Sequence, residues 1–336
     1  MNHNRLLSLV SASAGAMLAA TAMIISLPAN AQDLVSVKAG HLVAIDMAPL
    51  FVAKESGCFQ KEGLDVETVF FANPGDNNAA LAGGAIDFST NPFTLPFFAA
   101  NSGVPIKVVA AAGGWGAMEV IAQKETGLGS IGDITAYVAS GKPTLKIATL
   151  QGDTLELILT DAFTAEGVDP ASVEFVYFND LLAMVESFKA GQVNILSHIK
   201  PYTSQMIADK GAILLTTNAA TWDTMSPNTV VSVLEKTLAD RPEVVTGYLN
   251  GLICAAQIIN DTPEEAVALL TAGNYFRVTS DVLLASLKSA PAPVSFVPNV
   301  DSVQAVVGSL AALGYISGSV KASDIFALDL IESLQQ

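Results

Sequence analysis

Apolar runs alternate with amphipathic segments along most of the chain. The short apolar runs predict strands over residues 35–39, 66–70, 86–90, 107–112, 120–123, 145–149, 173–178, 193–197 and 230–234. Segments with helical spacing separate them, and in the first, over 47–61, Ala48, Phe51 and Phe59 share one face. Strands that alternate with helices of this length are typical of parallel βαβ units, so the pattern predicts an α/β protein.

The pattern changes after residue 234. From there on the spacing is helical, over 241–260, 263–272, 280–288, 300–313 and 322–333. Such a tail needs a surface on which to bury its apolar faces, and we expect it to return to the first α/β series. The predicted division is a first lobe of residues 32–117 plus 218–336 and a second lobe of residues 118–217.

The first 31 residues have the composition of a secretory signal peptide. A short basic start ends at Arg5, an apolar stretch runs from Leu6 to Leu27, and small residues flank the end of the segment at Ala29 and Ala31. An uncleaved membrane anchor is the alternative, because the apolar stretch is long enough to cross a bilayer. Pro28 and the many small residues favour cleavage, and no cysteine follows for lipid attachment. We therefore expect a freely diffusing periplasmic protein that begins near Gln32.

The charge balance is strongly acidic. The chain has 16 Lys and Arg residues; loss of Arg5 with the leader leaves 15 against 32 Asp and Glu, a net charge of −17. This charge repels nucleic acid and anionic lipid, and no basic cluster offsets it. We expect no nucleic-acid partner.

Two cysteines, Cys58 and Cys254, lie far apart in segments predicted to be helical. A single distant pair is no disulfide framework, and free cysteine packs as a small hydrophobe. We expect two separate buried thiols, with a disulfide as the alternative.

Motifs for catalysis or metal binding are scarce. After the leader the chain has two histidines, His41 and His198, and it has no Cys-x-x-Cys pair, phosphate-binding loop or Gly-x-Ser-x-Gly elbow. This composition favours a binding protein over an enzyme, and we expect no cofactor and no metal.

Several segments resemble the nitrate, sulfonate, taurine and thiamine-precursor binding proteins of ABC transporters. The longest is the run PLFVAKESGCFQKEGLDVE over 49–67, and the others are ALAGGAIDF over 80–88, AGQVN over 190–194, KPY over 200–202 and DRPEVV over 240–245. Asn194 stands where the family usually has Asp. The similarity extends from about residue 35 to residue 316.

The resemblance implies a type II periplasmic-binding-protein fold, with two α/β lobes, a ligand cleft between them and a helical C-terminal tail. It also implies a monomer that delivers a small molecule to a membrane permease. A thiamine-pyrimidine synthase-like enzyme of the same fold is the alternative, and the export signal argues against it. In open parallel sheets, ligands bind beyond the carboxyl ends of the strands, near helix N-termini, and lobe closure by a hinge buries them.

The candidate ligand-binding residues follow from that rule, because they come directly after predicted strands or lie near the first crossing between the lobes. They are His41, Asp46, Asn73, Ser89, Asn91, Trp115, Gly152, Asp153, Thr154, Asn179, His198 and Tyr202.

Helix capping and core packing are alternatives for many of these residues. Capping alone explains acids that precede helical segments, namely Asp46, Asp76, Asp153 and Asp180. Each histidine is either a satisfied core residue or a ligand contact through its neutral imidazole.

Aromatic and charged residues near the expected cleft leave further alternatives. Trp115 lies between glycines, and we expect open space around it and a stacking or lid role, with Trp222, Phe93 and Phe97 as weaker cases. Lys200 is expected to be a solvated residue at the rim, with pairing to an anionic ligand as the alternative, and Glu119 either binds an amine or lies at the hinge.

The ligand class stays open between a sulfonate and a neutral or amine-bearing heterocycle such as a pyrimidine. The arginines that follow the leader, Arg241 and Arg277, both fall in the helical tail, so none is expected in a candidate loop. Sites for doubly charged oxyanions commonly use arginine, but helix N-termini and hydroxyls can bind a sulfonate without it.

Overall fold

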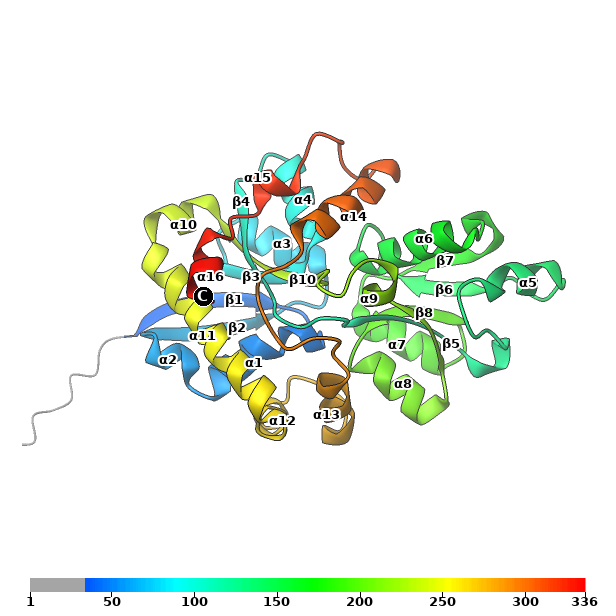
Figure 1. Ribbon diagram of the computed structural model, residues 1–336, viewed down its shortest axis with the longest axis horizontal. Coiled ribbons are helices and arrows are strands. Elements are labelled where there is room, and N and C mark those ends of the chain that lie inside the picture. The colour runs from blue at the N-terminus through cyan, green and yellow to red at the C-terminus, as the bar shows by residue number, and fades with distance from the viewer. Residues whose placement is uncertain (1–33, 336) are drawn as a thin grey trace, which may run out of the picture. The chain divides into compact units, whose positions relative to one another are not determined.

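A computed structural model describes residues 34–335, and its strands form two sheets of five (Figure 1). The predicted signal peptide lies outside these residues. The first sheet has the order β2-β1-β3-β10-β4 and the second β7-β6-β8-β5-β9. The strands are β1 (Val35–His41), β2 (Leu64–Phe70), β3 (Phe88–Pro92), β4 (Ile106–Ala111), β5 (Met118–Ala122), β6 (Lys146–Thr149), β7 (Glu174–Tyr177), β8 (Ile195–Ile199), β9 (Ile213–Thr217) and β10 (Thr229–Leu234).

Helices connect and cover these strands. The helices up to the end of the second sheet are η1 (Ile45–Met47), α1 (Ala48–Glu55), α2 (Cys58–Lys61), α3 (Pro74–Ala82), α4 (Thr94–Asn101), η2 (Lys124–Thr126), α5 (Asp133–Ala139), α6 (Thr154–Glu166), η3 (Pro170–Ser172), α7 (Leu181–Lys189), α8 (Tyr202–Lys210) and α9 (Asn218–Thr221). The later ones are α10 (Glu235–Asp240), α11 (Pro242–Asp261), α12 (Pro263–Ala272), α13 (Ser280–Lys288), α14 (Val300–Ala312), α15 (Ala322–Ile325) and α16 (Asp329–Leu334).

Each sheet combines parallel strands with one antiparallel strand near its middle. In the first sheet β1 pairs in parallel with β2 and β3, and β10 runs antiparallel between β3 and β4. In the second, β6 pairs in parallel with β7 and β8, and β5 runs antiparallel between β8 and β9. The predicted α/β class is thereby confirmed.

The first predicted helix is divided in two. Gly57 separates α1 from α2 with a left-handed φ of 78°, a conformation that ends a helix and favours glycine. The hydrophobic spacing continues across this break, because Phe51 and Phe59 are both fully buried. The prediction of one continuous helix over 47–61 is therefore wrong at Gly57.

The two cysteines form a disulfide, which corrects the expectation of separate thiols. Helix α11 of the tail packs against α1 and α2, and this contact brings the Cα atoms of Cys58 and Cys254 to 6.0 Å. Sequence separation alone, here 196 residues, does not show that a distant tail helix returns to the first helices.

The tail contacts helices of both sheets. Helix α11 lies beside α1 and α2, and α15 contacts α4 (Figure 1). Helix α13 contacts α8, and α14 contacts α6, both of which flank the second sheet. We expected the tail to pack on the first α/β series alone, but it also packs on helices of the second.

Candidate ligand-binding site

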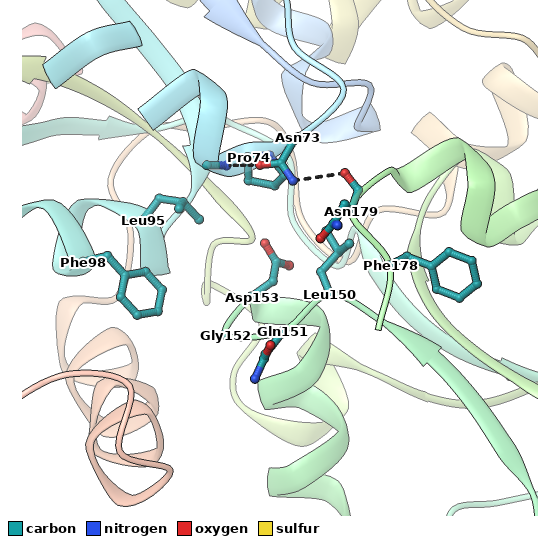
Figure 2. A pocket seen from close by; sticks show the side chains of 11 residues that line it. Asn73, Pro74, Leu95, Phe98, Leu150, Gln151, Gly152, Asp153, Phe178 and Asn179 are labelled. Atoms are coloured by element: carbon teal, nitrogen blue, oxygen red, sulfur yellow. Dashed lines mark hydrogen bonds between the residues drawn. The ribbon is translucent and has the colours of Figure 1, made fainter. Parts of the chain in front are cut away.

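A cavity of about 250 Å³ lies where strand-end loops of the two sheets meet (Figure 2). The first sheet contributes loop residues after β2 and side chains of α4, and the second contributes the loops after β6 and β7. The lining residues are Asn73, Pro74, Gly75, Leu95, Phe98, Leu150, Gln151, Gly152, Asp153, Phe178 and Asn179.

Asp153 is the charged side chain of this lining. It is the N-cap of α6, and its Oδ1 accepts hydrogen bonds from the Leu155 backbone N–H at 3.0 Å and from the Thr154 hydroxyl at 3.1 Å. Its Oδ2 is buried and has no hydrogen-bond partner within residues 34–335. Burial raises the pKa of Asp153 to about 6, against the opposing effect of the Leu155 N–H. A buried acceptor without a donor is costly, so a ligand N–H or O–H at Oδ2 would be stabilising.

The backbone of Gly152 is held in place by a hydrogen bond to a residue of α6, the helix that follows it. Its φ is +70°, and its N–H donates to Oε2 of Glu156 at 2.6 Å. The same carboxylate accepts hydrogen bonds from the hydroxyls of Tyr177, at 2.5 Å, and Tyr315, at 2.9 Å. Glu156 therefore joins the cavity loop to the C-terminal tail.

A hydrogen bond crosses the cavity between the loops after β2 and β7. The Asn73 side-chain amide donates to the Asn179 backbone oxygen at 3.0 Å, while its Oδ1 caps α3 by accepting from the Gly75 N–H (Figure 2). Figure 2 shows the Asp153 carboxylate pointing toward the Asn73 loop and the Phe178 ring turned away from the cavity. The structure thus brings four of the sequence-predicted residues together, namely Asn73, Gly152, Asp153 and Asn179.

Asp46 and Thr154 lie in a buried network at the second crossing between the sheets. Oδ2 of Asp46 accepts hydrogen bonds from the Asn228 amide and from both the N–H and the hydroxyl of Thr229. The Thr154 hydroxyl lies 2.8 Å from Oδ1 of Asn228. Burial raises the pKa of Asp46 to about 6. Sequence reasoning missed Asn228, although it directly precedes β10.

Two of the four predicted acidic caps are wrong. The N-cap of α1 is Met47, and Asp46 instead binds the start of β10; Asn73 caps α3 in place of Asp76, because Pro74 occupies the first helical position. Asp153 and Asp180 are confirmed as N-caps of α6 and α7.

Both histidines are buried and hydrogen-bonded to backbone oxygens. Nδ1 of His41 lies 2.7 Å from the oxygen of Leu42, and Nε2 of His198 lies 2.8 Å from the oxygen of Leu181. Burial lowers the pKa of His41 to about 4 and lowers that of His198. Neither lines the cavity of Figure 2, and Tyr202, which packs edge-on against His198, lines a different cavity.

Three further candidate residues, Ser89, Asn91 and Trp115, make hydrogen bonds within the protein and do not line the cavity of Figure 2. Ser89 donates to Oδ1 of Asn77, and Asn91 donates to the Pro74 oxygen, which supports the loop that carries Asn73. The expectation of open space around Trp115 is wrong, because its indole is buried and its N–H donates to Pro293.

Lys200 is not a solvated rim residue. It forms an ion pair of 3.4 Å with Glu119, and both side chains are 7 % exposed. The backbone oxygen of Lys200 also accepts a hydrogen bond from the N–H of Ile45 in the other sheet's strand-end loop. The register of the second sheet explains this ion pair. Strands β5 and β8 are neighbours, so Glu119 and Lys200 lie at the same end of that sheet.

The weaker stacking candidates Phe93, Phe97 and Trp222 do not line the cavity of Figure 2. Phe93 and Phe97 are fully buried in the core, and the adjacent Phe98 lines the cavity. Trp222 donates its indole N–H to Asp161 at 2.7 Å.

Residues 34–335 contain no cluster of three His, Cys, Asp or Glu residues placed to hold a metal ion. Over the same range no helix has the length and apolar character needed to cross a bilayer.

Comparison with known proteins agrees with this architecture. The model of the NMT1-like family matches residues 30–272. The nitrate/nitrite binding protein NrtA of Nostoc sp. (strain PCC 7120 / SAG 25.82 / UTEX 2576) is 25 % identical over 269 residues, which cover 75 % of this chain and 61 % of that protein. The chain thus spans about three fifths of the length of this curated relative.

Solved structures share the fold at lower identity. The periplasmic nitrate-binding protein NrtA from Synechocystis PCC 6803 superposes with a TM-score of 0.77 at 18 % identity, over 90 % of this chain and 89 % of that one. The alkanesulfonate-binding protein SsuA from Xanthomonas axonopodis pv. citri bound to MOPS gives 0.73 at 17 %, over 88 % and 99 %. A Candida albicans protein described as having the generic periplasmic binding protein structural fold gives 0.62 at 14 %, over 89 % and 94 %. The chain therefore has the type II periplasmic-binding-protein fold and belongs to the NMT1-like family.

Proposed function

We propose that the chain is the solute-binding protein of an ABC importer, which captures a small organic molecule between its two lobes and delivers it to a membrane permease. The family, and the names of relatives that bind nitrate or sulfonates, support this class. In this proposal the protein is a periplasmic monomer without enzymatic activity, with lobes of residues 32–117 plus 218–336 and 118–217.

The lining of the cavity supports a ligand that donates hydrogen bonds. It carries the Asp153 carboxyl and the amides of Asn73, Gln151 and Asn179, and no Lys or Arg is among its residues. A carboxylate without a neighbouring cation disfavours an anion such as nitrate or a sulfonate. An amine-bearing or neutral heterocycle, such as an aminopyrimidine, would satisfy the unpartnered Oδ2 of Asp153. The buried Oδ2 of Asp153, which has no hydrogen-bond partner within residues 34–335, is the observation on which this ligand class rests.

A thermal-shift panel on protein refolded to remove bound solutes tests the proposal. An aminopyrimidine at about 100 times its dissociation constant should stabilise the protein by about 2.7 kcal/mol, whereas nitrate, methanesulfonate and taurine should not. Asp153→Asn should weaken aminopyrimidine binding about 10- to 100-fold, while Asp180→Asn, which changes the cap of a neighbouring helix, should not. Stabilisation by nitrate or methanesulfonate instead would overturn the ligand class.

A further inference from the structure

A second and larger cavity, of about 480 Å³, lies between strand-end loops of the two sheets. The loops after β2 and β7 border both cavities, with Asn73 and Asn179 lining the first and Ala72 and Asp180 lining the second. Its other lining residues are Phe70, Leu182, Ala183, Val185, Glu186, Lys189, Tyr202, Gln205 and Arg277.

Arg277 gives this cavity a cation that the first cavity lacks. Arg277 lies in the tail as expected, between α12 and α13, and it lines the cavity together with Tyr202, one of the predicted ligand-binding residues. Within residues 34–335 no acidic side chain lies within ion-pair distance of its guanidinium. The preceding residues fix its place, because Tyr275 stacks on Phe51 at 4.1 Å and Phe276 packs edge-on against the same ring.

The lining also holds two acidic side chains and one lysine, namely Asp180, Glu186 and Lys189. Glu186 and Lys189 form an ion pair at 2.9 Å. Oδ1 of Asp180 accepts hydrogen bonds from two backbone N–H groups at the start of α7, at 2.7 and 2.9 Å. Arg277 is therefore the cation of the lining that has no acidic partner among residues 34–335, and a carboxylate on a ligand could pair with it.

Tyr202 supplies an unsatisfied polar group. Its side chain is 3 % exposed, its buried hydroxyl oxygen lies near the backbone N–H of Arg277, and its O–H proton has no acceptor within residues 34–335. Buried hydroxyls normally donate to an acceptor, so an acceptor atom on a bound molecule would be stabilising here. The amide of Gln205, one turn further along α8, is a further donor in the same lining.

Phe70 adds an aromatic surface. Its side chain is 51 % exposed at the end of β2, and its ring lies 5.9 Å from that of His41. With Leu182 and Val185 it forms an apolar wall. A ligand ring stacked on Phe70 would bury this exposed surface.

We propose that this cavity is a second ligand site, which takes a small aromatic carboxylate. The carboxylate binds the Arg277 guanidinium and the Tyr202 hydroxyl, and the aromatic ring packs on Phe70. The site is separate from the Asp153 cavity and of opposite charge preference. It extends the range of solutes that the protein can bind beyond the class proposed for the first cavity.

Calorimetric titration with benzoate tests the site, with benzamide as the uncharged analogue. Benzoate should bind and benzamide should bind at least about 10-fold more weakly, since it lacks the charge that pairs with Arg277. Arg277→Gln should weaken benzoate binding about 10- to 100-fold, and Arg277→Lys should do so to a smaller extent because lysine lacks the bidentate fork. Tyr202→Phe should cost about 10-fold.

Matched controls separate this site from the first cavity. Arg241→Gln removes the same charge at a residue paired with Asp87, away from the cavity, and should leave benzoate binding unchanged. Asp153→Asn should also leave it unchanged, so failure of the first site and failure of this one give different patterns. Absence of benzoate binding at about 10 mM, equal binding of benzamide, or full affinity in folded Arg277→Gln and Arg277→Lys proteins would each overturn the proposal.

Discussion

The buried Asp153 carboxyl predicts a stability cost that depends on pH. Burial moves its pKa from an ordinary value of 3.8 to about 6. The ionised form therefore costs the folded protein about 3 kcal/mol above pH 6 when no ligand is bound. Asp153→Asn removes this ionisation and keeps an N-cap, because asparagine caps helices as well as aspartate does. We expect the variant to gain about 2–3 kcal/mol in unfolding free energy at about pH 7.5, or about 5 °C in Tm.

The sign of the pH dependence is fixed by the direction of the shift. A carboxyl whose folded pKa is raised keeps its proton longer in the folded state than in the unfolded state. The wild-type protein thus has the full benefit of the protonated form below about pH 4 and loses it as the pH rises through about 6. The difference between variant and wild type should grow from near zero to its full value over that window.

Urea unfolding at a series of pH values, on ligand-free protein, measures this difference. Taking the difference between the two proteins removes the contributions of other buried groups, such as His41, whose lowered pKa acts in the opposite direction on acid stability. Asp180→Asn is the matched control, because Asp180 caps α7 in the same way from a more exposed position and should show little change. A stability difference for Asp153→Asn that is the same at about pH 4 and about pH 7.5, or a loss of stability at the higher pH, would refute the reasoning.

Three further substitutions test other parts of the structure. Cys58→Ser removes the disulfide to Cys254 and should lower the unfolding free energy by about 2–4 kcal/mol, with reduced wild-type protein showing the same loss in urea unfolding. Gly152→Ala forces a left-handed alanine whose Cβ would lie 3.1 Å from an aromatic ring; it should cost about 1–2 kcal/mol and abolish binding in the first cavity. Glu119→Gln leaves the buried Lys200 without its anion and should cost about 3–5 kcal/mol by thermal unfolding, and a Met at both positions should restore stability.

Most strand positions could be predicted because a buried strand appears in the local sequence as a short apolar run. Runs such as 107–112 and 193–197 are apolar enough to identify β4 and β8, and every residue of β8 is buried. Strand β9 was missed although residues 212–215 form the short apolar run AILL; it lies at the edge of the second sheet, where Ile213 and Leu214 are 37 % and 42 % exposed.

The site was predictable only where it depends on strand ends. Asn73 and Asp153 lie in the loops that follow β2 and β6, and the strand-end rule selects them without knowledge of the fold. Phe98 and Arg277 reach cavities through helix orientation and through packing of the tail, which depend on contacts between distant segments. No local pattern carries that information.

The antiparallel strand β10 has a consequence for the order in which the two sheets can be completed. The first sheet needs residues 35–111 and also residues 229–234, whereas the second sheet needs only 118–217. During synthesis from the N-terminus the sheet that starts second is therefore the first to have all its strands. Until residue 234 has emerged, β3 and β4 lack the strand that lies between them. The first sheet, although most of its strands are synthesised first, can therefore be completed only after all the strands of the second sheet have been synthesised.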